Sequence, residues 1–402
     1  MEQCDHQRIM KFFFSCVLVV FGVFFITGTN EAIAKEFFVA ASNGKDSNPG
    51  TKDAPFLTLK TGVGVLLPGD TLFVRTGTYL GSSSLSNIPN GTSWIAPVTI
   101  KTYQEENVVI IPEPGLTVLE FKPGNNYIIF DGFVFNATGG HAGIRTGEGS
   151  HHIRIMNSEI MNAPSQGILA NKDSASFEFI NLRVHHNGST KLDHGFYITS
   201  SFHLVKNCRI YRNMGRGVQI YSGGGNSPSN NILISNEIYE NGQSGNGVGI
   251  IIASGSGNQA INNVIWGETE RGIQVDISAT NTKIYNNTVY GAQKDGILIG
   301  SRATNTEVRN NISYNIGGEP FILLGTGTVH SNNLSINPQF FDADKRDFHL
   351  QPSSPAIKAG MTLSGVTTDF DGKERPKNAY DIGAFQSGNL LAPPMALRVL
   401  SY

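Results

Sequence analysis

The amino-acid sequence predicts an all-β protein built as a parallel β-solenoid, and three observations support this. A unit of short β-branched segments and a Gly turn recurs about every 24 residues, a period typical of solenoid coils. Helical repeats of that length would show hydrophobic residues at helical spacing, and none is visible. Charged residues make up only 15% of the chain, whereas 46 of 402 residues are Gly, which suits short strands joined by turns.

Each unit contains strands of alternating polarity. In the unit 207–222 we expect Val218 and Ile220 to point inward, and Gln219 and Tyr221 to point outward. A later unit repeats this pattern, with predicted inward positions at Ile273, Val275 and Ile277.

The units align on one position, occupied by Ser158, Leu182, Cys208, Asn236, Asn263, Asn287, Asn311 and Asn333. Asn side chains at the same turn of successive coils can bond to one another, because adjacent strands lie about 4.8 Å apart. We expect such an amide ladder to comprise Asn207, Asn236, Asn263, Asn287 and Asn311.

Residues 1–34 have the organisation of a secretory signal peptide. Arg8 and Lys11 precede an apolar run over residues 12–26, and Ala32-Ile33-Ala34 provides a cleavage site. The sequence therefore predicts a secreted protein, extracellular or periplasmic, without membrane attachment after cleavage. An uncleaved membrane anchor is the alternative.

Charge and cysteine content restrict the function further. The chain carries 30 Lys and Arg against 32 Asp and Glu, so it lacks the basic field that nucleic-acid binding requires. Cys4 and Cys16 lie in the signal, which leaves Cys208 as a buried structural thiol and no internal disulfide. We expect a monomer.

Residues 35–68 are predicted to cap the solenoid. A strand at residues 37–40 precedes a short amphipathic helix from about Pro55, with Pro at its first turn. Pro68-Gly69-Asp70 ends this helix, and the solenoid then runs over residues 69–336. A solenoid needs such a cap because its first coil would otherwise expose the core.

Two stretches resemble known proteins. The N-terminal stretch resembles the opening of secreted right-handed parallel β-helix proteins, including pectate lyases. The matching residues are Asn43-Gly44, Asp46, residues 48–51, Pro68-Gly69-Asp70-Thr71 and Gly77-Thr78-Tyr79. Residues 337–388 resemble the irregular segment that closes many such proteins. The resemblance implies a right-handed β-helix with an N-terminal helical cap and a C-terminal irregular cap, followed by a tail or linker at 389–402.

Titratable residues of mixed type gather near the Gly turns. The residues preceding these Gly are Ala142, Gln166, His194, Arg216, Asn246, Arg271 and Asp295. Lys191 and Asp193 lie just upstream of His194, and the predicted outward positions hold Tyr197, Gln219, Gln274 and Asp276. Solvated turn charges are one interpretation. Convergence on a rigid face, as acid–base chemistry on a sugar requires, is the other.

Lyase or C5-epimerase chemistry on a uronate needs three functions. A cation must neutralise the C6 carboxylate, and Arg216 and Arg271 are candidates. A base must remove the C5 proton, for which we consider His194 or Lys191. Tyr197 is the candidate acid.

Four further residues complete the predicted site. Asp193 is expected to orient His194 or to bind Ca²⁺, the candidate cofactor. We expect Gln219, Gln274 and Asp276 to bind substrate together with Arg271.

Asp193-His194-Gly195-Phe196-Tyr197 resembles the Asp-His signature of β-helix alginate epimerases and some lyases, although only Asp193 and His194 correspond. The chain lacks the Asp cluster of calcium-dependent pectate lyases. The resemblance implies an acidic polysaccharide as the substrate, without identifying the polymer.

Two alternatives remain open. A glycosidase needs two carboxylates, which Glu268, Glu270, Asp276 and Asp295 could supply. A non-catalytic binding protein would expose an aromatic stripe, for which the sequence offers Tyr211, Tyr239, Trp266 and Tyr290. We predict that these aromatic residues pack on one another instead.

Overall fold

The computed structural model describes residues 34–171, 173–223 and 227–388. The chain divides into two parts, residues 1–33 and 34–402, and the description below concerns the second. The predicted signal peptide, apart from Ala34, and the predicted tail lie outside the described residues. No helix in the described ranges has the length and hydrophobicity needed to span a bilayer.

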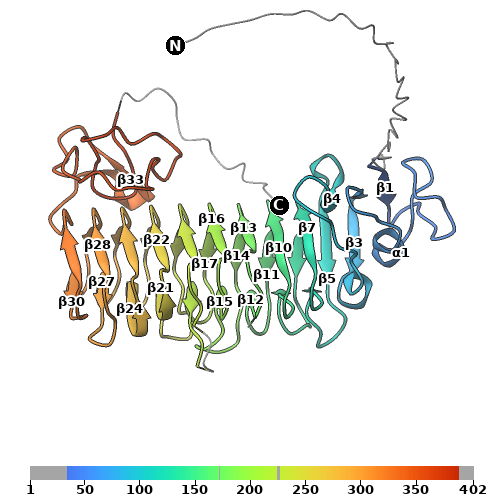
Figure 1. Ribbon diagram of the computed structural model, residues 1–402, viewed down its shortest axis with the longest axis horizontal. Helices are drawn as coiled ribbons and strands as arrows, with labels where there is room; N and C mark the ends of the chain where they lie inside the picture. Colours follow the sequence, from blue (N-terminus) through green and yellow to red (C-terminus); the bar gives the residue numbers. More distant parts are fainter. Residues whose placement is uncertain (1–33, 172, 224–226, 389–402) are drawn as a thin grey trace, which may run out of the picture. The chain divides into compact units, whose positions relative to one another are not determined.

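Three parallel sheets form the solenoid (Figure 1). Sheet A comprises β1 (Glu36–Val39), β2 (Thr71–Val74), β4 (Val98–Thr102), β7 (Asn126–Asp131), β10 (His151–Met156), β13 (Glu178–Ile180), β16 (Leu204–Lys206), β19 (Ile232–Ile234), β22 (Gln259–Ile261), β25 (Lys283–Tyr285), β28 (Glu307–Arg309) and β31 (Val329–Ser331). Sheet B comprises β3 (Gly77–Leu80), β5 (Val108–Ile111), β8 (Val134–Asn136), β11 (Glu159–Met161), β14 (Arg183–His185), β17 (Arg209–Tyr211), β20 (Glu237–Tyr239), β23 (Val264–Trp266), β26 (Thr288–Tyr290) and β29 (Ile312–Tyr314).

Sheet C comprises β6 (Leu119–Glu120), β9 (Ile144–Arg145), β12 (Ile168–Ala170), β15 (Phe196–Ile198), β18 (Val218–Ile220), β21 (Val248–Ser256), β24 (Arg271–Thr280), β27 (Ile297–Ile299) and β30 (Phe321–Leu323). Strand numbers rise by three along most of each sheet, so each coil contributes one strand to each sheet. The predicted all-β parallel solenoid is confirmed.

Inward side chains of successive coils stack into the core. Ile155, Phe179, Val205 and Leu233 are in register along sheet A and are fully buried. The predicted inward positions Val218 and Ile220 are confirmed. Ile277 is a correction, because β24 turns there: its φ is +59° and its side chain is 36% exposed.

An amide ladder links sheets A and B. The side-chain Nδ2 of Asn236 donates to Oδ1 of Asn263 at 2.9 Å, and the pattern continues through Asn287, Asn311 and Asn333. Asn207 does not belong to this ladder, contrary to prediction, because it is exposed and adopts φ +55°.

Cys208 holds the first ladder position instead of Asn207. Its backbone N–H donates to Oδ1 of Asn236, and its thiol is buried as predicted, with a pKa raised to about 12 by burial.

A second ladder follows sheet B. Asn187, Asn213 and Asn241 bond in sequence at 3.0 Å, and Nδ2 of Asn241 donates to Oε1 of Glu268 at 3.0 Å. All four side chains are fully buried. The ladder therefore fixes the turns that lead from sheet B into sheet C.

The N-terminal segment contains one short helix, α1 (Leu59–Gly64), and two 3₁₀ turns, η1 (Ser82–Leu85) and η2 (Tyr103–Glu105), follow in the first coils. Leu59 and Val63 of α1 are buried in the core cluster. The helix begins later than predicted from Pro55, because a carboxylate oxygen of Asp46 accepts hydrogen bonds from the backbone N–H groups of Leu57 and Thr58. Those bonds hold the chain extended up to the N-cap, Thr58.

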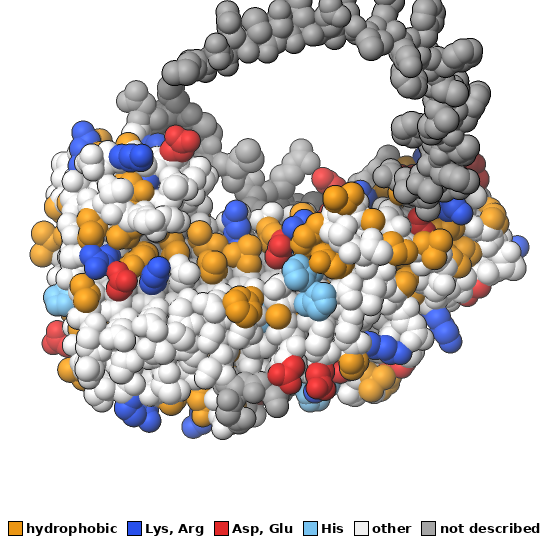
Figure 2. Space-filling view, in the orientation of Figure 1, with side chains coloured by type: hydrophobic (Ala, Val, Ile, Leu, Met, Phe, Trp, Pro, Cys, Tyr) orange, Lys and Arg blue, Asp and Glu red, His pale blue; other side chains and the backbone are white. Residues whose placement is uncertain are grey.

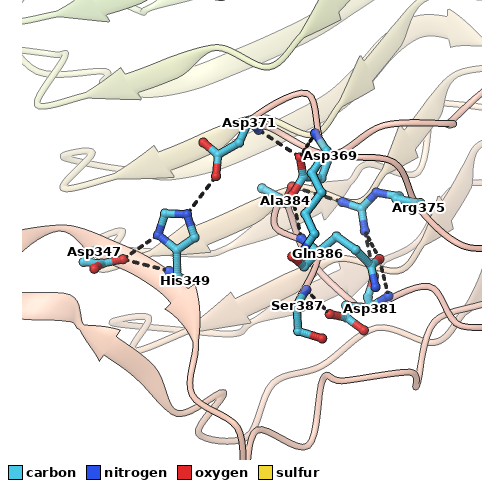
Figure 3. A network of polar contacts seen from close by, with 10 residues as sticks. Asp347, His349, Asp369, Asp371, Arg375, Asp381, Ala384, Gln386 and Ser387 are labelled. Atoms are coloured by element: carbon cyan, nitrogen blue, oxygen red, sulfur yellow. Dashed lines mark hydrogen bonds and ion pairs between the residues drawn. The ribbon is translucent and has the colours of Figure 1, made fainter. Parts of the chain in front are cut away.

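The C-terminal segment folds against the outer sides of the last coils. Its regular elements are a hairpin of β32 (Phe340–Asp342) and β33 (Asp347–Leu350), with η3 (Ala343–Lys345) between them. Buried Arg375 organises the rest: its Nη2 donates to the carbonyl oxygen of Ala384 (Figure 3). The same Nη2 donates to the carbonyl oxygen of Gly383 and to Oδ1 of Asn262 in the solenoid. Burial lowers the pKa of Arg375 to about 10.

Candidate active site on the outer face of sheet C

The turns entering sheet C bring the predicted residues into register. The backbone N–H of Gly195 donates to the carbonyl oxygen of Arg216, and that of Gly217 donates to the carbonyl oxygen of Val248. These bonds show which residues of successive coils occupy the same register position. Val248, and not the predicted Asn246, holds the register position between Arg216 and Arg271. The loop 240–247 lengthens that coil and displaces Asn246, whose φ is +63°. Arg216 and Arg271 are therefore two coils apart, about 10 Å along the solenoid.

A second row lies on the strands themselves. Tyr197, Gln219, Ile251 and Gln274 are partners in register on β15, β18, β21 and β24. Ile251 packs with Val248, Ala253 and Tyr221 in a small cluster on the outer side of the sheet. The repeat spacing does not reveal this apolar patch, because it places Asn246 at the register position that Val248 holds.

His194 lies beneath this surface. Its side chain is 1% exposed, and its Nδ1 accepts a hydrogen bond from the backbone N–H of Arg216 at 3.1 Å. Burial, and next the charge of Arg216, lower the pKa of His194 to about 3. The imidazole is neutral and carries its proton on Nε2, so it is a hydrogen-bond donor toward its surroundings.

Asp193 caps the loop before His194. Its Oδ2 accepts hydrogen bonds from the backbone N–H groups of Ser189 and Thr190, and its Oδ1 accepts one from Gln166. With these donors around both oxygens, Asp193 has little capacity left for a cation. No cluster of three His, Cys, Asp or Glu among the residues that the structure describes is placed to hold a metal. These side chains do not fit a calcium site, and we derive no step through Ca²⁺.

Arg216 extends from its turn toward the strand row. Its Nη1 donates to Oε1 of Gln219. Its Nε is buried and has no hydrogen-bond partner within the described parts of the chain. Burial lowers the pKa of Arg216, and burial raises the pKa of Tyr197, whose ring meets His194 edge-on at 5.7 Å between centroids.

Arg271 is held by acidic neighbours. Its Nε donates to Oδ2 of Asp295 at 2.8 Å, and its Nη1 lies 3.5 Å from Oε2 of Glu270. Lys294 pairs with the other oxygen of Glu270 at 2.8 Å. The sequence did not single out Lys294. With Lys294, Arg271 and Arg216, this part of the sheet C surface has three cations against the two carboxylates of Glu270 and Asp295.

Three other predicted residues lie at the edges of the cluster. Gln274 approaches Arg271, with Oε1 3.5 Å from Nη1. Asp276 lies further along β24, where Arg302 is 3.5 Å away. Lys191 is exposed, and its backbone carbonyl lies against Gly215, the residue before Arg216.

Carboxylates that a glycosidase would use are mostly engaged. Glu268 is fully buried and bonded to Asn241, and burial raises its pKa to about 8. Glu270 and Asp295 are paired with Arg271 and Lys294. Glu268 therefore has a structural position, which removes one member of the alternative pair.

The aromatic residues of sheet B stack on one another. Tyr211 and Tyr239 lie 4.8 Å apart with parallel rings, and Trp266 follows at 4.3 Å. The guanidinium of Arg346 covers Trp266 at 4.5 Å, while Tyr290 packs against Phe348 of the C-terminal segment. The predicted stack is confirmed for Tyr211, Tyr239 and Trp266, whose ring faces contact each other, whereas Tyr290 packs on the C-terminal segment instead.

A hollow opens on the same side of the solenoid three coils before Gln219. It has a volume of about 410 Å³, and its lining includes Glu120, Phe121, Arg145, Thr146, Glu148 and Asn171. The sequence carries no local motif for this hollow, because its lining residues come from separate coils.

A family model and several known proteins match this chain. The family model for the right handed beta helix region matches residues 120–243 and again 166–336. The uncharacterized protein YwoF of Bacillus subtilis (strain 168) is 36% identical over 87 residues, and pectate lyase PEL9 of Emericella nidulans is 33% identical over 85. These alignments cover 22% and 21% of this chain. The chain spans only 18% and 20% of the lengths of those two proteins.

Solved structures align over much more of the chain. Pectate lyase Pel9A has a TM-score of 0.73 at 18% identity, covering 88% of this chain and 96% of that one. A rhamnogalacturonan lyase gives 0.59 at 16% identity, over 80% and 96% of the two chains. An alginate lyase from Paenibacillus sp. str. FPU-7 gives 0.56 at 16% identity, over 75% and 99%. At these identities, the likeness establishes the fold.

Proposed function

The chain belongs to the right-handed β-helix family, and we propose that it is a secreted carbohydrate-active enzyme, a lyase or C5-epimerase that acts on an acidic polysaccharide. Solved structures of similar fold include pectate, rhamnogalacturonan and alginate lyases, which supports the substrate class. The sequence of residues 1–34 supports secretion, with the protein acting outside the cell or in the periplasm.

One observation carries the proposal. Nε of Arg216 is buried without a partner in the described ranges, beside an apolar patch on the outer side of sheet C. A guanidinium that is fixed through Nη1 and has an unpaired Nε–H can donate a hydrogen bond to a carboxylate oxygen. Neutralising the C6 carboxylate of a uronate makes its C5 proton removable, which is the difficult step of both reactions.

The remaining roles follow from protonation and access. Tyr197 stays protonated because burial raises its pKa, so it suits the acid that protonates the leaving O4 or the opposite face of C5. Lys191 is the remaining candidate base, because the buried His194 already uses Nδ1 to accept a hydrogen bond from the backbone N–H of Arg216. His194 and Asp193 then position Arg216 and the loop, and Arg271, Gln219, Gln274 and Asp276 bind neighbouring sugars.

The test is β-elimination on a panel of alginate, polygalacturonate and glycosaminoglycans, followed by the ultraviolet absorbance of the new C4–C5 double bond. Arg216→Gln should abolish product formation, whereas Arg212→Gln should retain it, because Arg212 pairs with Glu240 on sheet B. Elimination that survives Arg216→Gln would move the site elsewhere. If no unsaturated product forms, proton NMR of the same samples distinguishes epimerisation from inactivity.

A further inference from the structure

Two coils of sheet C carry the same pair of side chains, an Arg in the turn and a Gln on the strand. On the coil of β18, Nη1 of Arg216 donates to Oε1 of Gln219. On the coil of β24, Nη1 of Arg271 lies 3.5 Å from Oε1 of Gln274. The two pairs are separated by one coil, so they present two guanidinium groups about 10 Å apart along the solenoid.

The coil between these pairs is apolar at the corresponding positions. It holds Val248, Ile251 and Ala253, which form a cluster with the ring of Tyr221. Ile251 lies in register between the two Gln side chains of the neighbouring coils. Outward positions of a sheet that faces solvent are usually polar, so an apolar coil between two cationic ones indicates a ligand of mixed character.

The alternation extends one coil further. Leu298 of β27 is half-buried and in register with Gln274. The turn position of that coil holds Asp295, whose Oδ2 accepts a hydrogen bond from Nε of Arg271 and would repel another carboxylate. Coils with a guanidinium therefore alternate with coils that have an apolar centre. In Figure 2, Lys and Arg side chains lie next to hydrophobic ones along the lower edge of the molecule, where Figure 1 places β21, β24 and β27.

We propose that this face binds an acidic polysaccharide in which a uronate alternates with a sugar that bears a methyl group, either as a 6-deoxy carbon or within an N-acetyl group. The inference rests on the proposed function, because Arg216 holds the carboxylate of the reacting uronate. One pyranose residue lengthens an extended chain by about one coil spacing of 4.8 Å, so successive sugars lie over successive coils. Uronates then lie over β18 and β24, and the methyl-bearing sugar lies over Ile251.

A homopolymer of uronates fits this face less well. Its middle residue would bring a carboxylate or hydroxyl groups against Val248 and Ile251, whose side chains have no hydrogen-bonding atoms. A polar group that is buried without a partner lowers the affinity. A methyl group on the middle sugar gains apolar contact with the same side chains and with the ring of Tyr221.

Binding of oligosaccharides of equal length tests the proposal without relying on catalysis. The full chain carries Tyr197→Phe, which lacks the proposed acid and leaves the ligand intact during calorimetric titration. The alternating ligands are fragments of the rhamnogalacturonan backbone, with a 6-deoxy sugar, and of hyaluronan, with an N-acetyl sugar. The homopolymeric ligands are fragments of polygalacturonate and alginate.

One of the alternating ligands should bind at least about tenfold more tightly than both homopolymeric ones, the effect of one polar group left without a partner. The tighter of the two alternating ligands identifies the source of the methyl group. Equal or tighter binding of a homopolymeric ligand would overturn the proposal.

Ile251→Gln tests whether the apolar coil sets the preference. Gln219 and Gln274 hold the same register position on the neighbouring coils, so the strand accommodates this side chain. The preference for the alternating ligand should fall about tenfold in this variant. Ile232→Gln makes the same change at a half-buried position of sheet A and should retain the preference. A preference that survives Ile251→Gln would contradict the proposal, and the comparison of ligands decides it alone if this variant does not fold.

Failure of the selectivity and failure of the proposed catalysis are distinguishable. If the expected preference is found but wild-type protein neither forms an unsaturated product nor removes the C5 proton, the lyase or epimerase activity fails and the assignment of the ligand stands. If wild-type protein acts on polygalacturonate or alginate as readily as on the alternating polymers, the activity stands and the assignment of the ligand is overturned.

Discussion

The backbone N–H of Arg216 donates a hydrogen bond to Nδ1 of His194, 3.1 Å away on the preceding coil. This bond joins the two residues that the sequence brings to one face, and it gives them different roles. It occupies the lone pair on Nδ1 with which His194 would accept a proton as a base. It also fixes the backbone from which the Arg216 guanidinium reaches Gln219. We therefore infer that His194 is a positioning residue.

His194 should not shape the pH dependence of the activity. Burial lowers its pKa to about 3, so it remains neutral from about pH 5 to 8, where an ordinary His titrates. We expect His194→Ala to reduce kcat by displacing Arg216, and the residual activity to keep the wild-type pH profile. A profile of kcat/KM against pH on the preferred polymer checks this. A limb near the ordinary His pKa that disappears in His194→Ala would make His194 the base.

His203→Asn should remove part of the acid sensitivity of folding. His203 is buried and its pKa is lowered to about 3 by burial, while the unfolded His binds a proton below about pH 6.5. The unfolded state therefore binds more protons, and stability falls as pH drops from 6.5 toward 3. At pH 4 this costs about 3 kcal/mol. Asn suits the position because Asn231 and Asn258 hold the equivalent places on the next coils.

Urea unfolding of wild type and His203→Asn at pH 7 and pH 4 measures this effect. The wild type should lose more stability between the two values than the variant, by about 3 kcal/mol. Equal losses would show that His203 does not titrate on unfolding. His330→Asn, at an exposed position, is the matched control.

Glu268→Gln should stabilise the protein at neutral pH. Burial raises the pKa of Glu268 to about 8, so the folded state keeps a proton that the unfolded state releases above about pH 4.5. Stability is thus highest below pH 4.5, falls as pH rises to about 8, and is constant above it. Gln keeps the acceptor for Asn241 and cannot ionise.

The gain from Glu268→Gln should be about 3 kcal/mol at pH 7 and should vanish near pH 4. Chemical denaturation at the two pH values, with Glu240→Gln as an ion-paired surface control, provides the measurement. A variant that is equally destabilised at both pH values would show that the shape of the side chain matters here and its ionisation does not.

The C-terminal segment should loosen as pH rises. The imidazole of His349 lies between Oδ1 of Asp347 at 2.6 Å and Oδ2 of Asp371 at 2.8 Å (Figure 3). Burial disfavours the charged ring, but the bonds to Asp371 and Asp347 outweigh it and raise the pKa of His349 above its ordinary value. The stabilisation is complete below about pH 6.5 and is lost as pH rises through the higher folded value.

Hydrogen exchange of residues 340–371 at pH 6 and pH 9, corrected for the intrinsic rate, should show faster opening at the higher pH. His349→Gln should exchange equally fast at both values after that correction. Faster opening of the wild type at the lower pH would contradict the charge assignment.

The repeat pattern predicted the fold because a solenoid has one local rule, in which each coil buries β-branched residues against the next. The same repeat pattern predicted the first Asn ladder. It also contains the signal for the second ladder, which was not predicted, since Asn187, Asn213 and Asn241 recur at the coil spacing. Asn207 was misplaced because two adjacent candidates, Asn207 and Cys208, fit the same period. A one-residue shift decides which side chain points inward.

The candidate site was harder to predict because it depends on contacts between coils. The longer loop before Val248 moved the register by two residues and hid the apolar patch around Ile251. The hydrogen bond that occupies His194 and the buried Nε of Arg216 are properties of cross-coil geometry, which residue types alone do not contain. Composition and spacing could therefore gather the residues on one face, but they could not assign their roles.

If Arg216 makes the C5 proton of a uronate removable, proton NMR in deuterated water will show the loss of that proton. Both elimination and epimerisation remove that proton, so the C5 signal of the polymer should decay with wild-type protein and with Arg212→Gln. It should persist with Arg216→Gln. A C5 signal that persists while the wild-type protein shortens the polymer would exclude proton removal at C5 and indicate a hydrolase.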